Sequence, residues 1–268
     1  MKAVPKPPVL QADGVSLEYR ADGRVVRATH RVSFELHEAE RFVLLGPSGC
    51  GKSTLLKAAA GFLAPIEGEF RLDGERVHGP GPERMVVFQE FDQLPPWKTV
   101  LGNTMFPLLA SGRLAKAEAR ERAMHYLNKV GLASFAGVYP HQLSGGMKQR
   151  VAIARALAMH PRVLLMDEPF ASLDALTRRR MQDELLALWD EIRFTLLFVT
   201  HSIDEALRVG HRVALLSPHP GRMLAEINSP APGTAPAEVQ SAAERIHRLL
   251  FGDAAPPDAA NEPRRRAA

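Results

Sequence analysis

The segment from Gly46 to Thr54 constrains this chain more than any other. It reads Gly-Pro-Ser-Gly-Cys-Gly-Lys-Ser-Thr and matches the pattern G-x-x-x-x-G-K-[ST]. A short apolar run, Phe42 to Leu45, precedes it, and a helical stretch, Leu55 to Ala60, follows it. This order of strand, loop and helix predicts a phosphate-binding loop, whose backbone N–H groups converge on phosphate oxygens at the positive end of a helix dipole.

The side chains of this loop have separate expected tasks. Lys52 adds a positive charge for the outer phosphates, Ser53 offers its hydroxyl to Mg²⁺, and Thr54 supports the phosphates from the first helical turn. Cys50 stands at a variable position of the pattern, where we expect a tolerated small side chain, with a catalytic thiol as the alternative. The expected phosphate contacts are Gly46, Pro47, Ser48, Gly49, Cys50, Gly51, Lys52, Ser53 and Thr54.

Two further apolar runs end in polar side chains. The run Val163 to Asp167 is followed by Glu168, and the run that starts at Leu196 ends in His201. Ligands of open α/β sheets lie at the carboxyl ends of the strands. We therefore expect Asp167 to hold the metal directly or through water, Glu168 to polarise the water that attacks the terminal phosphate, and His201 to contact that phosphate. Solvated loop acids and a structural histidine are the alternatives.

Short apolar runs alternate with longer helical stretches along the chain, which is typical of an α/β protein with a mainly parallel, buried sheet. Central strands are expected at 42–45, 85–89, 163–167 and 196–201, because these runs lack the polar alternation of half-exposed strands. Segments 15–19, 32–36 and 69–72 are mixed in polarity and lie near turn signals. They predict a peripheral antiparallel β subdomain.

Helical spacing dominates 116–130 and 146–160, so a helical subdomain at about 91–160 is expected to be inserted into the core. A helix is expected from Ala175 to Ile192, with an apolar stripe packed on the core. After Ser217 the chain is rich in Pro, Ala and Gly, apart from a short helix expected at 237–250. The expected division is an ATPase domain over 1–230 and a low-complexity extension over 231–268, with residues 252–268 disordered. The members of the apolar stripe are Met181, Leu185, Leu188 and Ile192.

The composition of the chain limits where in the cell it is expected to work and which partners it is expected to bind. The chain has 268 residues, a formal net charge of +4 and one cysteine, with no run of the ~18 to 20 apolar residues that a membrane span needs. Its first ten residues lack the apolar core of a signal peptide, so a cytoplasmic location is expected. Three of its cations, Arg264, Arg265 and Arg266, read as a solvated tail, with weak attraction to anionic lipid as the alternative. The small surplus of charge argues against a nucleic-acid partner.

The segment Leu143-Ser144-Gly145-Gly146-Met147-Lys148-Gln149-Arg150 resembles the signature motif of ATP-binding cassette (ABC) proteins. A serine and two glycines that open a helix can form a second phosphate-binding N-terminus. The resemblance extends over residues 10–227, and it implies a RecA-like P-loop NTPase core. It also implies that Ser144, Gly145 and Gly146 contact the ATP held by a second copy of the chain.

Several other residues take their expected roles from this resemblance. Tyr19 is similar to the aromatic residue that stacks on adenine, and Gln89 is similar to the glutamine that contacts Mg²⁺ and the attacking water. The loop Ala171 to Asp174 resembles the loop that crosses to the partner cassette, and His201 resembles the switch histidine. The expected catalytic set is thus Glu168, His201, Lys52 and Gln89, with Ser53, Gln89 and Asp167 at the metal.

Within the family, the segments 79–84, 88–97 and 167–177 look most like those of importers of nitrate, sulfonates or taurine. That resemblance implies a separate integral-membrane permease, contacted near Gln89 to Trp97, and an external solute-binding protein that meets this chain only indirectly. It places the chain on the inner face of the cell membrane. Candidate permease contacts are Phe91, Leu94, Pro96 and Trp97.

Two other classes of protein remain as alternatives. A soluble cassette ATPase that acts on nucleic acid or ribosomes would carry two cassettes or a long coiled coil, and this chain has neither. A nucleotide-binding subunit without catalysis would lack the acid after the metal aspartate or the switch histidine, and here both Glu168 and His201 are present.

Overall fold

The computed structural model describes residues 7–21, 24–231 and 233–252. The arginines of the tail, Arg264, Arg265 and Arg266, and the segment 253–268 lie outside the described residues. Within the described ranges, no helix combines the length and the hydropathy needed to cross a membrane.

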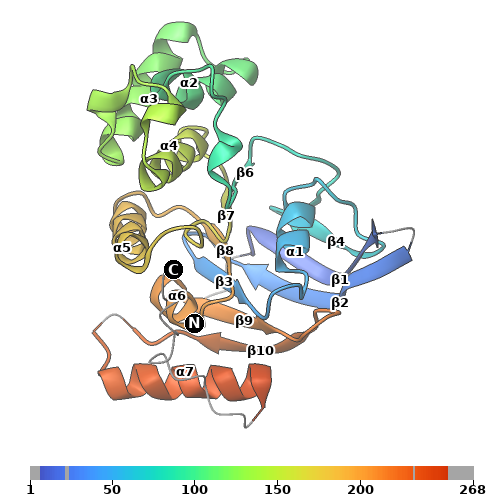
Figure 1. Ribbon diagram of the computed structural model, residues 1–268. Helices are drawn as coiled ribbons and strands as arrows, with labels where there is room; N and C mark the ends of the chain where they lie inside the picture. The colour runs from blue at the N-terminus through green and yellow to red at the C-terminus, as the bar shows by residue number, and fades with distance from the viewer. Residues whose placement is uncertain (1–6, 22–23, 232, 253–268) are drawn as a thin grey trace, which may run out of the picture.

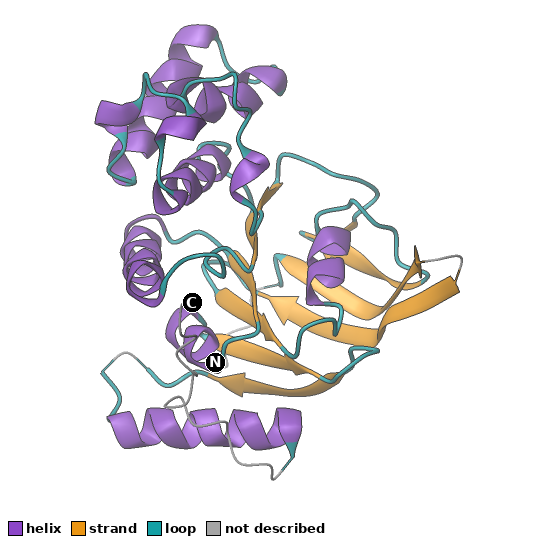
Figure 2. Ribbon diagram, viewed as in Figure 1, coloured by secondary structure: helices purple, strands orange, loops and turns teal. Residues whose placement is uncertain are grey.

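A six-stranded sheet forms the centre of the fold, with the strand order β10-β9-β3-β8-β7-β6 (Figures 1 and 2). The strands β9, β3, β8, β7 and β6 run parallel, and β10 pairs antiparallel with β9 at one edge. This arrangement confirms the expected α/β class with a mainly parallel sheet. The bounds are β3 Arg41–Leu45, β6 Arg84–Val87, β7 Val163–Asp167, β8 Leu196–Thr200, β9 Arg212–Leu216 and β10 Met223–Asn228.

Both faces of the central strands are buried. In β3, Val43 and Leu45 belong to one hydrophobic cluster, whereas Phe42 and Leu44 belong to another on the opposite face. The same alternation holds in β7 and β8. Because a strand covered on both faces needs apolar residues throughout, these strands were the easiest to recognise from sequence.

The second sheet is antiparallel, with the order β2-β1-β4-β5, and it lies beside the central sheet with α1 between them (Figure 1). The peripheral β subdomain expected from the sequence is therefore present. Its strands are longer than the expected segments. Register shifts and exposed polar residues interrupt the strand pattern in the sequence, so only part of each strand was recognised. The bounds are β1 Leu10–Ala21, β2 Arg24–Leu36, β4 Glu67–Leu72, β5 Glu75–Arg76 and α1 Lys52–Ala59.

A block of helices stands at the other end of the molecule, beyond β6 and β7 (Figure 1). The helices expected at 116–130 and 146–160 are present as α3 and α4, but α2 was not expected. Its sequence is apolar on most sides and holds Pro107, so helical periodicity is weak. The bounds are η1 Phe91–Gln93, α2 Val100–Ala110, α3 Lys116–Lys129, η2 Ala133–Phe135, η3 Pro140–Gln142 and α4 Gly145–Leu157.

The remaining helices cover the face of the central sheet that lies opposite α1. Helix α5, Ala175–Ile192, begins and ends where the sequence predicts, and its apolar stripe is packed on the core. Helix α6 spans Ile203–Val209, and α7 spans Pro236–Phe251. Ile246 and Leu250 of α7 are buried in the same cluster as the sheet, whereas the division of the chain at residue 230 stays a prediction.

Three strands were not expected from the sequence: the short β5, and the longer β9 and β10. Strand β9 is an apolar run that was not recognised, and β10 falls where loops were expected after Ser217. In β10, half-buried and exposed residues alternate, as in an edge strand with one face against α7 and the other toward solvent. Its nearness to Pro- and Gly-rich segments hid this alternation.

The turn between β9 and β10 fastens both sheets to the phosphate-binding loop. Gly221 N donates to Ala28 O at 2.9 Å, and His30 N donates to Gly221 O at 2.9 Å, so the turn bridges to β2. A Cβ atom at Gly221 would lie 2.1 Å from Cys50 O. Only a glycine therefore allows this close approach of three backbones.

We expect Gly221→Ala to lower the free energy of unfolding by about 1 to 3 kcal/mol, because the added methyl group must displace the backbone of the loop. Urea denaturation measures the change. The matched control is Gly137→Ala, since a Cβ atom there would meet nothing within 4 Å. Equal stability of the two variants would contradict the close packing described above.

Candidate active site

Three adjacent strands bring the candidate catalytic residues to one edge of the sheet. Lys52 and Ser53 open α1 after the loop that follows β3, and Glu168 follows β7. His201 follows β8, which lies between β3 and β7. Parallel strands all present their carboxyl ends at the same edge. Residues that lie more than a hundred positions apart in sequence are therefore in contact.

Ser53 and Asp167 form the first contact across this edge. The Ser53 hydroxyl donates a hydrogen bond to Asp167 Oδ1 at 2.7 Å, and Asp167 is only 8% exposed. Burial raises the pKa of Asp167, the negative charge of Glu168 adds to this rise, and the hydrogen bond from Ser53 opposes it. One carboxylate and one hydroxyl thus lie together as hard oxygen donors, the kind that Mg²⁺ prefers.

Lys52 is buried, with 4% of its surface exposed. Its ammonium group donates hydrogen bonds to Gly46 O at 2.8 Å and Pro47 O at 2.9 Å, and lies 3.9 Å from Glu168 Oε1. A buried cation needs such compensation, because leaving water is costly for a charge. The side chain is held by the loop that it follows, with its charge beside the acid.

Glu168 and His201 form the third contact. His201 Nδ1 lies 2.8 Å from Glu168 Oε2, and the histidine side chain is about half exposed while the glutamate side chain is 17% exposed. Because an ionised carboxylate only accepts, Nδ1 carries the proton in this arrangement and leaves Nε2 free to face a ligand. Glu168 has a backbone φ of 43°, in the left-handed region that non-glycine residues seldom adopt.

The phosphate loop is shaped by glycines and by a buried thiol. Gly51 caps α1 with a φ of 96°, and a Cβ atom there would lie 2.6 Å from Ala28 O. Cys50 is fully buried, and burial raises the pKa of its thiol while the charge of Lys52 opposes the rise. A buried, protonated thiol is a poor nucleophile, so the structure supports the packing role of Cys50 over the catalytic one.

Tyr19 and Gln89 stand apart from the contacts described above. Tyr19 lies on β1 and is 45% exposed, and Gln89 is exposed two residues after the end of β6. Within the described part of the chain, neither forms a hydrogen bond with the Lys52, Asp167 and Glu168 group. The strand expected to end at Gln89 ends at Val87, because the backbone turns there to meet other partners.

Gln93 and Gln149 supply those partners, and sequence reasoning missed both. Gln93 Nε2 donates to Phe88 O at 2.8 Å, and Gln149 Nε2 donates to the same oxygen at 3.1 Å. Arg155 Nη1 donates to Gln93 O at 2.7 Å. These bonds tie the segment around Gln89 to α4. No local pattern marks an amide that bonds to backbone 61 residues away.

The segment Gln89 to Trp97 is uneven in exposure. Trp97 is 74% exposed and Pro96 is exposed, but Leu94 is only 2% exposed and packs in the core of the helical block. Leu94 was therefore wrongly expected to be a surface contact. The side chain of Phe91 lies outside the described residues.

Ser144 and the two glycines after it open α4, as expected. The Ser144 hydroxyl accepts a hydrogen bond from Met147 N at 3.3 Å, so it caps the helix, and Ser144 remains exposed. Asp174 caps α5 in the same way by accepting from Thr177 N at 3.0 Å. No hydrogen bond joins Ser144 to the Lys52 group among the described residues.

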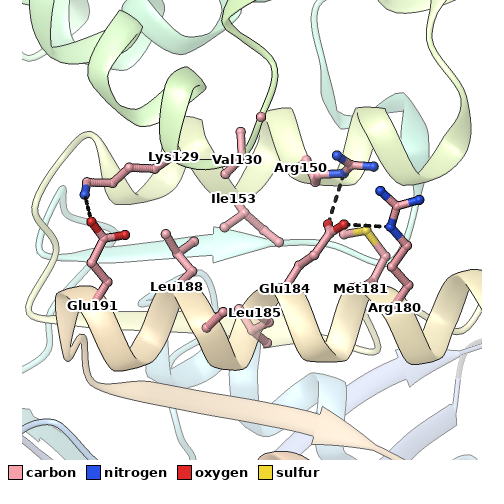
Figure 3. Close-up of a pocket in the computed structure, with 12 residues that line it drawn as sticks. Lys129, Val130, Arg150, Ile153, Arg180, Met181, Glu184, Leu185, Leu188 and Glu191 are labelled. Carbon is pink, nitrogen blue, oxygen red and sulfur yellow. Dashed lines mark hydrogen bonds and ion pairs between the residues drawn. The ribbon is translucent and has the colours of Figure 1, made fainter.

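Helices α4 and α5 face each other across a cavity of about 480 Å³ (Figure 3). Glu184 of α5 pairs with Arg150 at 3.2 Å and with Arg180 at 3.0 Å, and Glu191 pairs with Lys129 from the end of α3. Between these pairs, Ile153 of α4 lies over Leu185 and Leu188 of α5 (Figure 3). Ion pairs at the rim of this cavity thus join the helical block to α5, and the hydrophobic cluster of the central sheet continues into the helical block through α3 and α4.

The fold and this edge of the sheet define a P-loop nucleotide-binding protein. Residues 29–171 match the family described as "ABC transporter". The chain is 50% identical over 221 residues to a taurine import ATP-binding protein, TauB, of Rhizobium johnstonii, which covers 82% of this chain and 84% of that protein. It is 48% identical over 214 residues to an uncharacterized ABC transporter ATP-binding protein of Methanocaldococcus jannaschii, covering 80% of this chain and 79% of that one.

Two solved structures support the same family. The dimeric structure of a bacterial ABC transporter cassette superposes with a TM-score of 0.72 at 33% identity, covering 83% of this chain and 99% of that chain. A cassette in a post-hydrolysis state bound to ADP and Pi gives a TM-score of 0.70 at 32% identity, covering the same shares of both chains. The chain belongs to the ABC transporter family, as an ATP-binding cassette ATPase.

The raised pKa of Asp167 predicts how the stability of the folded chain depends on pH. Because its pKa is raised, the ionised form is disfavoured in the folded chain, so its contribution to stability falls as pH rises from the ordinary aspartate pKa through the raised one. At pH 7 we expect Asp167→Asn to raise the melting temperature by about 2 to 4 °C, the shift that a change on the order of 1 kcal/mol gives in a chain of this size.

Scanning calorimetry without nucleotide measures this change. The difference between the variant and the original chain should shrink as pH falls toward the ordinary aspartate value, since the carboxyl then becomes neutral. A lower melting temperature for the variant at pH 7 would contradict the assigned electrostatics.

Proposed function

We propose that the chain is the ATP-hydrolysing subunit of an importer for a small anionic or zwitterionic solute of the nitrate, sulfonate or taurine type. The observation that carries the proposal is the contact of Lys52, Glu168 and His201 at one sheet edge, in a chain 50% identical to a taurine import ATP-binding protein. The solute would pass through a separate permease. The subunit would lie at the cytoplasmic face of the membrane, attached through that permease.

The phosphates of ATP would bind the loop Gly46 to Thr54, whose N–H groups lie at the start of α1. Lys52 is already fixed by two carbonyl groups, so it would meet the phosphates without a large loss of side-chain entropy. Tyr19, exposed on β1, would stack on adenine. The remaining contacts would come from the backbone of the loop.

Mg²⁺ fits the oxygen donors Ser53 and Asp167, with Gln89 as a further expected ligand. When bound, the metal would neutralise charge on the phosphate oxygens. Asp167 would hold it directly or through water. Gln89 is exposed, so its side chain is accessible to such a ligand.

Glu168 would accept the proton of the attacking water, and His201 would orient Glu168 through Nδ1 while Nε2 faces the terminal phosphate. Both side chains lie in the same hydrogen-bonded pair, so their positions are mutually fixed. The low exposure of Glu168 keeps competing water away from its second oxygen, which lies beside Lys52.

A second copy of the chain would complete each site. Ser144, Gly145 and Gly146 would contact ATP held by the partner's phosphate loop, since they open α4 and Ser144 is exposed there. The dimeric form of a structurally similar cassette supports this arrangement. ATP between two copies would favour the closed dimer, and hydrolysis would remove that bias.

The permease would contact the chain near Gln89 to Trp97. Trp97 is the most exposed aromatic side chain among the described residues, and Phe106 of α2 is also exposed. Aromatic anchors of this kind dominate the binding energy of interfaces. The bonds from Gln93 and Gln149 to Phe88 would pass a displacement of this surface to α4.

We expect Glu168→Gln to lower steady ATP hydrolysis at least about 100-fold, because the amide cannot accept the proton of water. The variant should persist as a dimer in ATP, as measured by size-exclusion chromatography with light scattering. The control is Glu238→Gln, an exposed acid in the first turn of α7. Turnover of Glu168→Gln equal to that of the control would remove the role given to Glu168.

We expect Trp97→Ala to weaken binding of the permease at least about tenfold without changing the melting temperature, since the side chain is largely exposed. Copurification of the integral-membrane partner from detergent-solubilised membranes, quantified by mass spectrometry, measures the loss. Leu249→Ala, on the exposed side of α7, is the control. Equal recovery of the partner with both variants would place the permease elsewhere.

A further inference from the structure

A second cavity lies at the opposite edge of the central sheet from the ATP site. Its volume is about 840 Å³, within the range of small-molecule sites. It is lined by α5 and α6, by the first residue of β3, by the two residues that precede β9, and by described residues that follow β10. Nothing in the proposed mechanism uses it.

Arginines dominate the charge of this cavity. Four arginines and two aspartates line it, namely Arg41, Arg179, Arg193, Arg208, Asp190 and Asp204. Two of the arginines have acidic partners: Arg193 pairs with Asp190 at 3.2 Å, and Arg208 pairs with Asp183. Arg41 and Arg179 have no ion-pair partner among residues 7–21, 24–231 and 233–252. The cavity therefore carries uncompensated positive charge.

Arg41 is the unusual member because it is only 7% exposed. Its Nε donates to Val209 O at 2.6 Å, but neither Nη makes a hydrogen bond with another described residue. Burial lowers the pKa of Arg41, and the nearby charge of Arg193 lowers it further, against the opposing effect of Asp190. Buried arginines are almost always paired with an acidic group. Arg41 has no such ion pair, so its guanidinium group is available to an anionic ligand.

The surroundings hold Arg41 in place. Its guanidinium carbon lies 4.0 Å from the ring centroid of Trp189, and that of Arg193 lies 4.1 Å from the same centroid. Trp189 is itself fixed by donating from Nε1 to Phe194 O at 2.8 Å. Two guanidinium groups on one indole ring repel each other, so an anion between or beside them would relieve an existing strain.

Two further polar groups in the lining of the cavity lack a hydrogen-bond partner. The Ser229 hydroxyl and Arg208 Nε are buried polar atoms without a hydrogen-bond partner. Ser229 N donates to His211 O at 2.8 Å, which brings this hydroxyl beside the wall formed by β9. His211 Nδ1 accepts from Arg41 N at 3.2 Å, and burial together with the charge of Arg41 lowers the pKa of this histidine. The nearby carboxylates of Glu40 and Asp190 act on the pKa of His211 in the opposite direction.

We propose that this cavity is a binding site for a small molecule that carries a phosphate or sulfonate group. The two Nη atoms of Arg41 form a planar fork that matches two oxygens of such a group, and the Ser229 hydroxyl is a third donor. The neighbouring Arg193 contributes charge. The site lies away from the phosphate loop and does not depend on the role proposed for the chain in import.

Tryptophan fluorescence tests the proposal directly. The chain has two tryptophans, Trp97 and Trp189, so the variant Trp97→Phe leaves Trp189 as the only reporter, and it lies in the wall of the cavity. Sodium methanesulfonate, sulfate and phosphate are titrated at constant ionic strength, with dimethyl sulfone as the uncharged analogue of methanesulfonate. We expect a saturable change with the anions and none with the sulfone.

Variants in the Trp97→Phe background identify the groups responsible. Arg41→Met should weaken anion binding at least tenfold. Arg193→Gln, at a side chain that is 56% exposed, should weaken it about threefold. Arg71→Gln, on β4 outside the cavity, should leave the dissociation constant unchanged.

The proposal is overturned if no anion gives a saturable change, if the sulfone acts as strongly as methanesulfonate, or if both cavity variants bind as the parent does. Should Arg41→Met fail to fold, Arg193→Gln alone decides between these outcomes. A stronger response to phosphate than to methanesulfonate would assign the site to phosphorylated compounds, and the reverse order would assign it to sulfonates.

Discussion

The edge of the sheet that holds the candidate site depends on the hydrogen bonds of one buried group, the ammonium group of Lys52. A lysine that is 4% exposed can keep its charge only if polar groups replace water around it. The carbonyls of Gly46 and Pro47 do so, and they can reach the ammonium only when the loop curls back over the start of α1. The geometry of the phosphate-binding loop therefore follows from the need to compensate one charge.

The rest of the structure supports that curl from several sides. Because Gly51 and Gly221 have no Cβ atom, the phosphate-binding loop, β2 and the β9–β10 turn can approach one another closely. Cys50 is buried in the same region. Glu168 reaches Lys52 from β7, in a left-handed backbone conformation that the fold must hold against its intrinsic cost. The helical block shares the hydrophobic cluster of the central sheet and also meets α5 through ion pairs around a cavity.

The sequence predicted most parts of the fold that are buried on both faces or strongly amphipathic, although β9, which is also buried on both faces, was missed. Strand β7 and helix α5 have the predicted bounds, since an uninterrupted apolar run and a regular stripe leave little ambiguity. Strand β10 and helix α2 were missed, because one is a half-exposed edge and the other is apolar on most sides. The residues of the site could be named from motifs, but their contacts could not. The burial of Leu94, the packing of Cys50, and the bonds from Gln93 to Phe88 depend on segments that meet only in three dimensions.

In the proposed function, each chain holds two incomplete halves of an ATP site, which only a second copy can complete. The most direct test is the specific ATPase activity of the purified chain as a function of its concentration, at saturating ATP and Mg²⁺. A site shared between two copies predicts a specific activity that rises with protein concentration and then levels off as the dimer forms. A constant specific activity down to the lowest concentration, in a chain shown to be monomeric there, would contradict it.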